Sequence, residues 1–490
     1  MRRSTSGLTI FASVVFGGFS SAAHADDWTG ISFGAGGGYG MVNHELNVSE
    51  GPLIPPPIAF DLNVDGLAGE GGFFTLGVGA DYQINSRFLI GAFFDYDFMN
   101  LDTGLSLAVP PLGGLSASAN MEVEDQWSIG GRVGYLANPA TLLFVSAGYS
   151  HADVSDLTFA ATIGGTTTKG VLAGIGDFGG AFVGAGFETK LSHGFSLKAE
   201  YRYTNLQSER ITLLPDLAPA INDFVTTELA PDIQTVRLSL NYRYGLGSKD
   251  QEAVHDASSG PVNRSWTGPY AGIGGGYGAA NNNVTLTEGP ALPPGFFTVD
   301  LDGLSHKGGL FTMGAGYDIQ THPSIVVGGF IDYDLASIEH EDTLSVSFGA
   351  PVLNVSLKTE FENILMIGAR AGYLTAPDTL LFATAGYARS EMSNLTFAGS
   401  IGGGNLAGVL ASGETYSGFF AGAGVETMLT SDISLKAEYR YIDLGSEPIT
   451  LLPGLAPAIN NFVSTEFDPV IQTGRVSINY RFGGSSSAGP

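Results

Sequence analysis

The sequence predicts an all-β fold whose antiparallel strands cross a membrane, and three observations support it. Apolar and polar side chains alternate with a period of two along many segments, the N-terminus has the pattern of a secretory signal, and the chain contains two copies of one unit. Strict alternation places every second residue on one face of a strand. Hydrophobic residues at 44% and aromatic residues at 11% also exceed what a disordered chain contains, so the chain is expected to fold.

The first 25 residues predict export from the cytoplasm. Arg2 and Arg3 precede an apolar stretch that ends at Phe19, and Ala23-His24-Ala25 follows it. This is the order of a charged region, an apolar region and a cleavage site in a signal peptide, which we expect over 1–25. The stretch is shorter than the roughly 20 apolar residues of a spanning helix. No later apolar run is long enough either, so strands are expected to make any membrane crossing.

The remaining chain is a tandem duplication. Trp28-Thr29-Gly30 recurs at 266–268, and the run 197–203 recurs at 435–441, each 238 residues further along. A polar segment of mixed charge separates the copies and has the composition of a linker. The expected organisation is a signal peptide at 1–25, a first β-barrel repeat at 26–246, a periplasmic linker at 247–264, a second repeat at 265–482 and a C-terminal tail at 483–490.

Each copy is expected to contain eight strands, which in the first copy lie near 31–46, 71–84, 87–101, 122–136, 141–154, 179–191, 195–206 and 232–244. The connections alternate in length. Turns such as Asn85-Ser86 are short, whereas the connections near 47–70, 102–121, 155–178 and 207–231 are long. Short periplasmic turns and long extracellular loops are typical of transmembrane β-barrels. Aromatic residues such as Tyr82 and Trp127 stand near the predicted strand ends, where aromatic girdles form.

On these features the chain resembles the small eight-stranded outer-membrane β-barrels of Gram-negative bacteria, of the OmpA and OmpX type, and porin-like surface proteins. The resemblance rests on the signal peptide, the glycine-rich run 34–40, the strand from Lys198 to Tyr203 and the closing aromatic strand. It implies an antiparallel up-and-down barrel in the outer membrane, in contact with outer-membrane lipid and the barrel assembly machinery. The duplication and the tail that follows Phe482 depart from the family pattern.

Two eight-stranded barrels and one sixteen-stranded barrel are both compatible with this repeat, and we expect two. About eight strands enclose an interior that side chains can fill, whereas sixteen leave an aqueous channel. The predicted inward faces carry Phe73, Phe93, Phe144 and Phe182, which favours filling. The linker is also much longer than the other turns on its side, as expected for a tether between separate barrels.

Charged residues of both signs lie on the predicted inward faces. A buried charge without a partner is heavily penalised, so these residues are expected to pair as an ion-pair plug, with a proton or ion relay as the alternative. The expected interior charge network consists of Asp81, Asp95, Asp97, Arg132, Glu188, Lys198, Glu200, Arg202, Arg237, Arg243, Lys436, Glu438, Arg440, Arg475 and Arg481.

No catalytic, cofactor or metal site is expected. The absence of cysteine excludes a thiol nucleophile and Cys-ligated metals. The run 61–66 imitates half of a calcium loop, but Gly72 stands where the bidentate Glu is required. The glycine motif at 174–179 leads into a predicted strand and not a helix. The histidines have no metal-binding spacing and are expected on the solvated surface, and 48 acidic against 21 basic residues disfavour nucleic-acid binding.

The fourth long loop is unusually apolar. The run 211–224 is nearly repeated at 449–462, and such a segment either packs over the barrel mouth or contacts a partner. Loops 207–231 and 445–469 are therefore candidates for a surface partner. The expected function is a non-enzymatic outer-membrane protein with a structural or surface-interaction role, exposing long acidic loops. The alternative is a porin for small solutes, and the remote alternative is an outer-membrane enzyme.

Overall fold

The computed structural model describes residues 28–56, 58–191, 193–245, 265–348, 352–401 and 404–482. The predicted signal peptide, the linker and the tail lie outside these residues. Within them the chain is almost entirely β-strand, with two short 3-10 helices, η1 (Pro219–Asp223) and η2 (Pro457–Asn461). Neither these nor any other helix of the described part is long and apolar enough to cross a membrane.

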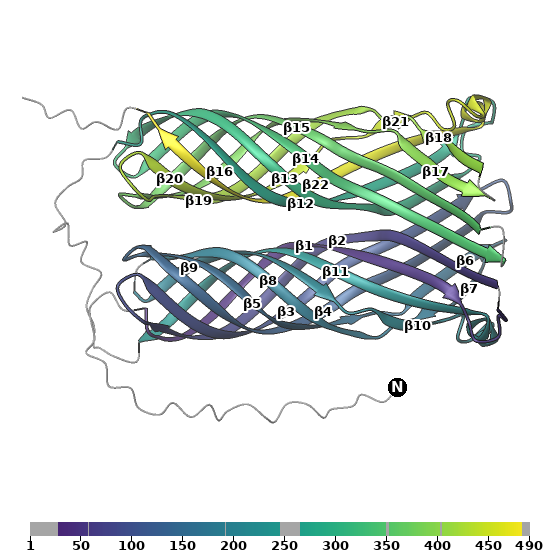
Figure 1. Cartoon of the computed structure of the whole chain (residues 1–490), viewed down its shortest axis with the longest axis horizontal. Helices are drawn as coiled ribbons and strands as arrows, with labels where there is room; N and C mark the ends of the chain where they lie inside the picture. Colours follow the sequence, from purple (N-terminus) through teal and green to yellow (C-terminus); the bar gives the residue numbers. More distant parts are fainter. Residues whose placement is uncertain are drawn as a thin grey trace, which may run out of the picture.

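The first repeat closes into an eight-stranded antiparallel barrel, drawn in purple to teal in Figure 1. Each strand pairs with the next, and the last pairs with the first. The eight strands are β1 (Gly30–Glu50), β2 (Ile58–Gln83), β3 (Phe88–Val109), β4 (Leu115–Asn138), β5 (Thr141–Val154), β8 (Asp177–Lys190), β9 (Phe195–Leu206) and β11 (Val225–Gly245).

The second repeat closes in the same way, and the two barrels lie side by side (Figure 1). Its strands are β12 (Gly268–Glu288), β13 (Thr298–His322), β14 (Ile325–Phe348), β15 (Val352–Ala376), β16 (Thr379–Met392), β19 (Thr415–Met428), β20 (Ile433–Asp443) and β22 (Val463–Arg481). The prediction of two eight-stranded barrels is therefore confirmed.

An apolar band surrounds each barrel next to the short turns. On β3 the outward side chains from Phe88 to Phe98 are largely exposed and apolar. The rings of Phe88 and Tyr135 pair near the turns, and those of Phe94 and Trp127 stack toward the loops. Ten residues of tilted strand span about 25 Å, the height of the apolar band of an outer-membrane barrel. The strands continue well beyond this band toward the loops.

The predicted loops are mostly strand, which corrects the expected boundaries. Only short connections remain within 47–70 and 102–121, because β1 to β4 extend into them. The segment 155–178 forms β6 (Leu157–Ile163) and β7 (Thr166–Gly174), and 207–231 contains β10 (Glu209–Leu213) and η1. The corresponding second-repeat strands are β17 (Leu395–Ile401), β18 (Gly404–Ala411) and β21 (Glu447–Ile449). These additions pair the backbone of the long strand ends, which would otherwise lack partners.

The two barrels share one sheet at the loop end. Beyond the pair Glu70 and Asp102, β2 and β3 separate. The end of β2 then pairs with β14, and the end of β3 pairs with β13. The two junctions are related by an approximate two-fold axis. Asp61 pairs with Ser345 in one junction, and their counterparts in the other repeat, Thr298 and Ala108, pair with each other in the other junction.

The loop end of the sheet forms a rim that runs around both barrels. Pairings between β18 and the segment after β21, and between β7 and β10, complete the circuit. In order, the rim contains β1, β2, β14, β15, β17, β18, β21, β22, β12, β13, β3, β4, β6, β7, β10 and β11. The molecule therefore has two separate barrels at membrane level and one continuous sheet edge at the loop end.

Candidate functional site

The barrel interiors gather charged side chains because alternate residues of each strand point inward and glycines on neighbouring strands leave space for them. On β9, Glu200 faces the interior and lies opposite Gly186 of β8 and Arg237 of β11. A methyl group added at Gly184 would lie 2.5 Å from the Ser146 hydroxyl and 2.8 Å from the Glu200 carboxylate. Part of the high glycine content therefore makes room for long charged side chains inside narrow barrels.

The charge cluster near the turns of the first barrel alternates two arginines with two carboxylates. Arg132 contacts Asp81 at 2.6 Å and Glu188 at 2.8 Å, and Arg243 contacts the same two acids at 2.6 and 3.2 Å. All four side chains are buried. The Ser196 hydroxyl also donates to Glu188 at 2.5 Å. With two charges of each sign, this cluster is neutral.

A second cluster fills the middle of the same barrel with three acids and three bases. Arg202 contacts Asp95 at 2.8 Å and Glu200 at 3.0 Å, and its guanidinium lies 5.2 Å from the Phe93 ring and 4.4 Å from the Phe182 ring. The other members also pair, Arg237 with Asp97 at 3.0 Å and Lys198 with Glu200 at 3.7 Å. Guanidinium stacked on an aromatic face adds attraction to the ion pairs.

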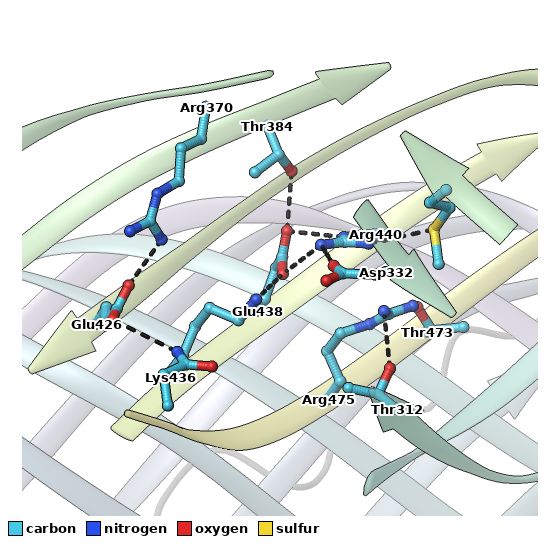
Figure 2. Close-up of polar contacts among 12 residues, drawn as sticks. Thr312, Asp332, Arg370, Thr384, Glu426, Lys436, Glu438, Arg440, Thr473 and Arg475 are labelled. Atoms are coloured by element: carbon cyan, nitrogen blue, oxygen red, sulfur yellow. Dashed lines mark hydrogen bonds and ion pairs between the residues drawn. The ribbon is translucent and has the colours of Figure 1, made fainter. Parts of the chain in front are cut away.

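The second barrel repeats both clusters, as Figure 2 shows for part of them. Arg370 contacts Glu426 at 2.7 Å, Arg440 contacts Glu438 at 2.7 Å, and Arg475 contacts Asp334 at 2.8 Å. Lys436 lies 3.4 Å from Glu438, and Arg481 lies 3.2 Å from Glu426. Five members are absent from the charge network predicted from the sequence, although the repeat offset leads to each of them: Asp318, Asp332, Asp334, Arg370 and Glu426.

Both interiors are closed toward the loops by an apolar core. In the first barrel this core includes Val42, Phe73, Leu101 and Ile233, and the second barrel has a corresponding core. Between the two charge clusters of the first barrel lies a cavity of about 30 Å³. Such a volume holds one or two water molecules and excludes a solute.

The barrels also touch through side chains, mostly on the loop side of the apolar band. Lys307 of the second repeat forms ion pairs with Glu45 and Asp232 of the first, the latter at 3.0 Å. Two aromatic contacts cross the junction, Tyr39 with Tyr441 at 6.1 Å and Tyr203 with Tyr277 at 5.9 Å. At the turn end, the Asn138 amide donates to Asp378 at 3.0 Å and to Thr379 at 2.7 Å.

The expectation that the histidines lie on the solvated surface is wrong for three of them. His44, His306 and His340 are at most 3% exposed. His44 faces the apolar core of the first barrel, and the rings of His306 and His340 lie 5.2 Å apart in the second. Burial lowers the pKa of His44 to about 3 and that of His306 well below its usual value, with His340 as a smaller cause. The alternation along the strands carries them inward. His306 and His340 stand on strand ends that correspond to the expected loops 47–70 and 102–121, whereas His44 lies within the expected strand 31–46.

One group of three side chains in the described part of the chain has the donor types and spacing of a metal site. The ligand atoms of His151, Asp153 and Asp177 lie within 4.8 Å of one another. Asp153 and Asp177 are register partners on β5 and β8, and the His151 ring stacks on Trp127. The sequence pattern does not reveal this group, because Asp177 lies on another strand, remote along the chain from His151 and Asp153. The second repeat has Arg389 where the first has His151.

The apolar loop 207–231 has an inner and an outer part. Ile211 belongs to the buried core, whereas Leu217 and Phe224 are 63% and 49% exposed. The Asn222 side chain bonds both the amide and the carbonyl of Leu213 at 2.8 Å, which orders the loop. Loop 445–469 has the same organisation, with Leu455 and Phe462 exposed at its tip.

Comparisons with known proteins agree with this architecture. A 28% identical relative over 218 residues, covering 44% of this chain and 84% of that protein, is the 31 kDa outer-membrane immunogenic protein of Brucella melitensis biotype 1. The Brucella suis biovar 1 protein of the same description matches to the same extent.

Three solved structures are less informative, because TM-scores this low support no argument. OprG of Pseudomonas aeruginosa is 10% identical, covers 45% of this chain and 100% of its own, and has a TM-score of 0.28. Neisserial surface protein A is 18% identical, with 44% and 98% covered and a TM-score of 0.19. The Pseudomonas putida toluene transporter TodX is 10% identical, with 92% and 90% covered and a TM-score of 0.24.

The family assignment rests on both repeats. The model of the outer membrane protein beta-barrel domain matches residues 11–244 and again residues 253–482. Together these matches cover nearly the whole chain, and each contains one of the two closed barrels. The chain therefore belongs to the outer membrane protein β-barrel domain family, of which it carries two copies, and it is a protein of the Gram-negative outer membrane.

Proposed function

We propose that this chain is a non-conducting, non-enzymatic outer-membrane protein whose two plugged barrels carry a joint acidic platform at the cell surface. The observation that carries the proposal is the pair of filled interiors. In each barrel, five acids and five bases pair inside the strands, and an apolar core covers them toward the loops. Buried ion pairs of this kind resist the entry of water, because opening a path would separate buried charges.

The acidity of the chain lies almost entirely on the loop side, which the rule for outer-membrane barrels places outside the cell. The segments beyond the apolar band are 39–73, 99–126, 151–179, 204–235, 277–310, 336–363, 389–417 and 442–473. They contain 31 acidic and 5 basic residues, a balance of −26 against −27 for the whole chain. A field of this sign attracts basic partners and repels nucleic acid.

The exposed loop tips supply the apolar part of the platform. Leu217 and Phe224 in loop 207–231, and Leu455 and Phe462 in loop 445–469, are exposed beside acidic residues such as Asp216 and Asp223. Exposed apolar groups within a polar surround are typical of protein contact sites. A structural or surface-interaction role through these two loops therefore fits the molecule better than transport.

Conductance across a planar lipid bilayer tests the proposal. The purified full chain is expected to insert without steady openings. The double variant Arg202→Ala with Arg440→Ala removes the stacked guanidinium from both interiors and should admit water and raise the ion current. Lys169→Ala, a change at an exposed loop residue, is the matched control and should remain silent. Large, stable openings of the unmodified chain would reject the proposal and support the porin alternative.

A further inference from the structure

The charged residues at the junction differ between the repeats, in contrast to the interior clusters. Lys307 of the second repeat corresponds to Glu70 of the first. It forms ion pairs with Glu45 and Asp232, which belong to the first repeat. The corresponding residues of the second repeat are Asn283 and Val470, which carry no charge. The lysine thus occurs in one copy only, and the acids that bind it occur in the other.

Apart from these charges, the two repeats contribute equivalent contacts to the junction, so the charges can decide which repeat pairs with which. Exchanging the repeats converts the contact of Tyr39 with Tyr441 into that of Tyr277 with Tyr203, and both contacts are present. The strand pairings at the rim obey the same exchange. A junction between two first repeats or between two second repeats would therefore have the same backbone pairing and the same aromatic contacts, and would differ mainly in charge.

The charges favour the mixed pair most strongly over a pair of first repeats. Two first repeats would place Glu70 against Glu45 and Asp232 at both equivalent positions, three carboxylates in a partly buried contact. Two second repeats would place Lys307 against Asn283 and Val470, with Asp468, the register partner of Asn283, as the one acid beside them. Like charges brought together in a contact cost several kcal/mol, which penalises the junction of two first repeats. Only a first repeat facing a second repeat gives the lysine both Glu45 and Asp232.

We propose that the two repeats have become complementary halves, and that Lys307 with Glu45 and Asp232 makes the first repeat recognise the second repeat and not its own kind. The occupant of each junction surface is thus the opposite repeat of the same chain. The rim then closes within one molecule, and neighbouring chains at the cell surface are not drawn into strand pairing with one another.

Disulfide trapping across the rim tests this in the full chain, which has no cysteine of its own. Leu62 and Leu344 are register partners in the junction between β2 and β14, and paired positions of a sheet approach the Cα separation of a disulfide. With both changed to Cys, mild oxidation should produce a crosslink within one chain. Adding Lys307→Glu should slow this crosslink about tenfold, the equivalent of about 1.4 kcal/mol, and produce crosslinks between chains.

Two further variants make the test specific. Lys358→Glu reverses another lysine on the loop side, one that pairs with Glu339 of its own repeat, and should leave the crosslink unchanged. Adding Asp232→Lys to Lys307→Glu exchanges the charges and should restore crosslinking within the chain, which also shows that the single variant can fold. An unchanged rate with Lys307→Glu, an equal loss with Lys358→Glu, or no restoration in the exchanged variant would overturn the proposal.

Discussion

The charged residues inside the barrels are the same in the two repeats, whereas those at the junction between the repeats are different. Ten interior charges of the first barrel have the same residue types at the corresponding positions of the second, and they pair in the same way. At the junction, Lys307 faces acids that only the first repeat possesses. The interior pairs therefore serve each barrel by itself, whereas the junction depends on a difference between the copies.

The largest expected effect is the loss of stability when a buried acid is removed, and comparing this loss between the barrels tests whether their interiors are equivalent. Glu200→Ala and Glu438→Ala should each destabilise the protein by about 3 to 5 kcal/mol, because each leaves buried bases without their acid. Unfolding of the full chain in detergent micelles, followed by heat or denaturant, measures the loss. Glu209→Ala, at an exposed loop residue, is the control. Unchanged stability together with increased ion flux would show a water-filled interior instead of a plug.

Overpacking the interior should cost less. Gly184→Ala places a methyl group against Glu200 and Ser146, and Gly422→Ala places one 2.6 Å from the Tyr439 carbonyl and 2.7 Å from Thr384. Each change should lower stability by about 1 to 3 kcal/mol, and by similar amounts in the two barrels. Gly176→Ala, which has open space around it, should be neutral in the same unfolding measurement. A large difference between the two barrels would contradict their equivalence.

Acid should loosen the loop end in preference to the membrane band. The pKa of His44 and that of His306 are lowered by burial, so below about pH 6.5 the unfolded chain binds protons that the folded chain does not. Stability is therefore lost as the pH falls, by about 1.4 kcal/mol for each histidine at pH 5.5. Amide hydrogen exchange, compared at pH 7.5 and pH 5.5, measures this loss of stability.

A matched change separates the two repeats in that experiment. His44→Asn introduces the residue that the second repeat has at this place, Asn282, and should remove the acid sensitivity of the first repeat alone. Exchange that accelerates equally in the membrane band and at the loop end would argue against buried histidines as the cause.

The last prediction concerns the orientation of the barrels in the membrane and involves no change in stability. Proteases added to intact cells should cut within 207–231 or 445–469, where the loop tips are exposed. The turns at Asn85-Ser86 and Ala376-Pro377 should remain protected on the periplasmic side. Peptide mapping after brief digestion identifies the sites, and initial cleavage at the short turns would reverse the topology.

Local pattern predicted the membrane half of the molecule well. The expected strands 141–154 and 195–206 coincide with β5 and β9, because the period of two and the short turns are local properties. The loop half was not predictable in this way. The ends of β2 and β3 are strands because they pair with β14 and β13, at least 190 residues away in sequence. The meeting of Asp153 with Asp177 was also not predictable from local pattern, because β6 and β7 lie between their strands in the sequence.

The shared rim has a consequence for the order of assembly. Its inter-repeat pairs join residues that are far apart in sequence, and contacts of large sequence separation form slowly. Each barrel can close from neighbouring hairpins before the rim exists. Until then, the outer ends of β2, β3, β13 and β14 are open strand edges, which readily pair with any strand they meet. A chain arrested after its first barrel would be adhesive, and completion of the second barrel is the step that makes the molecule inert toward its neighbours.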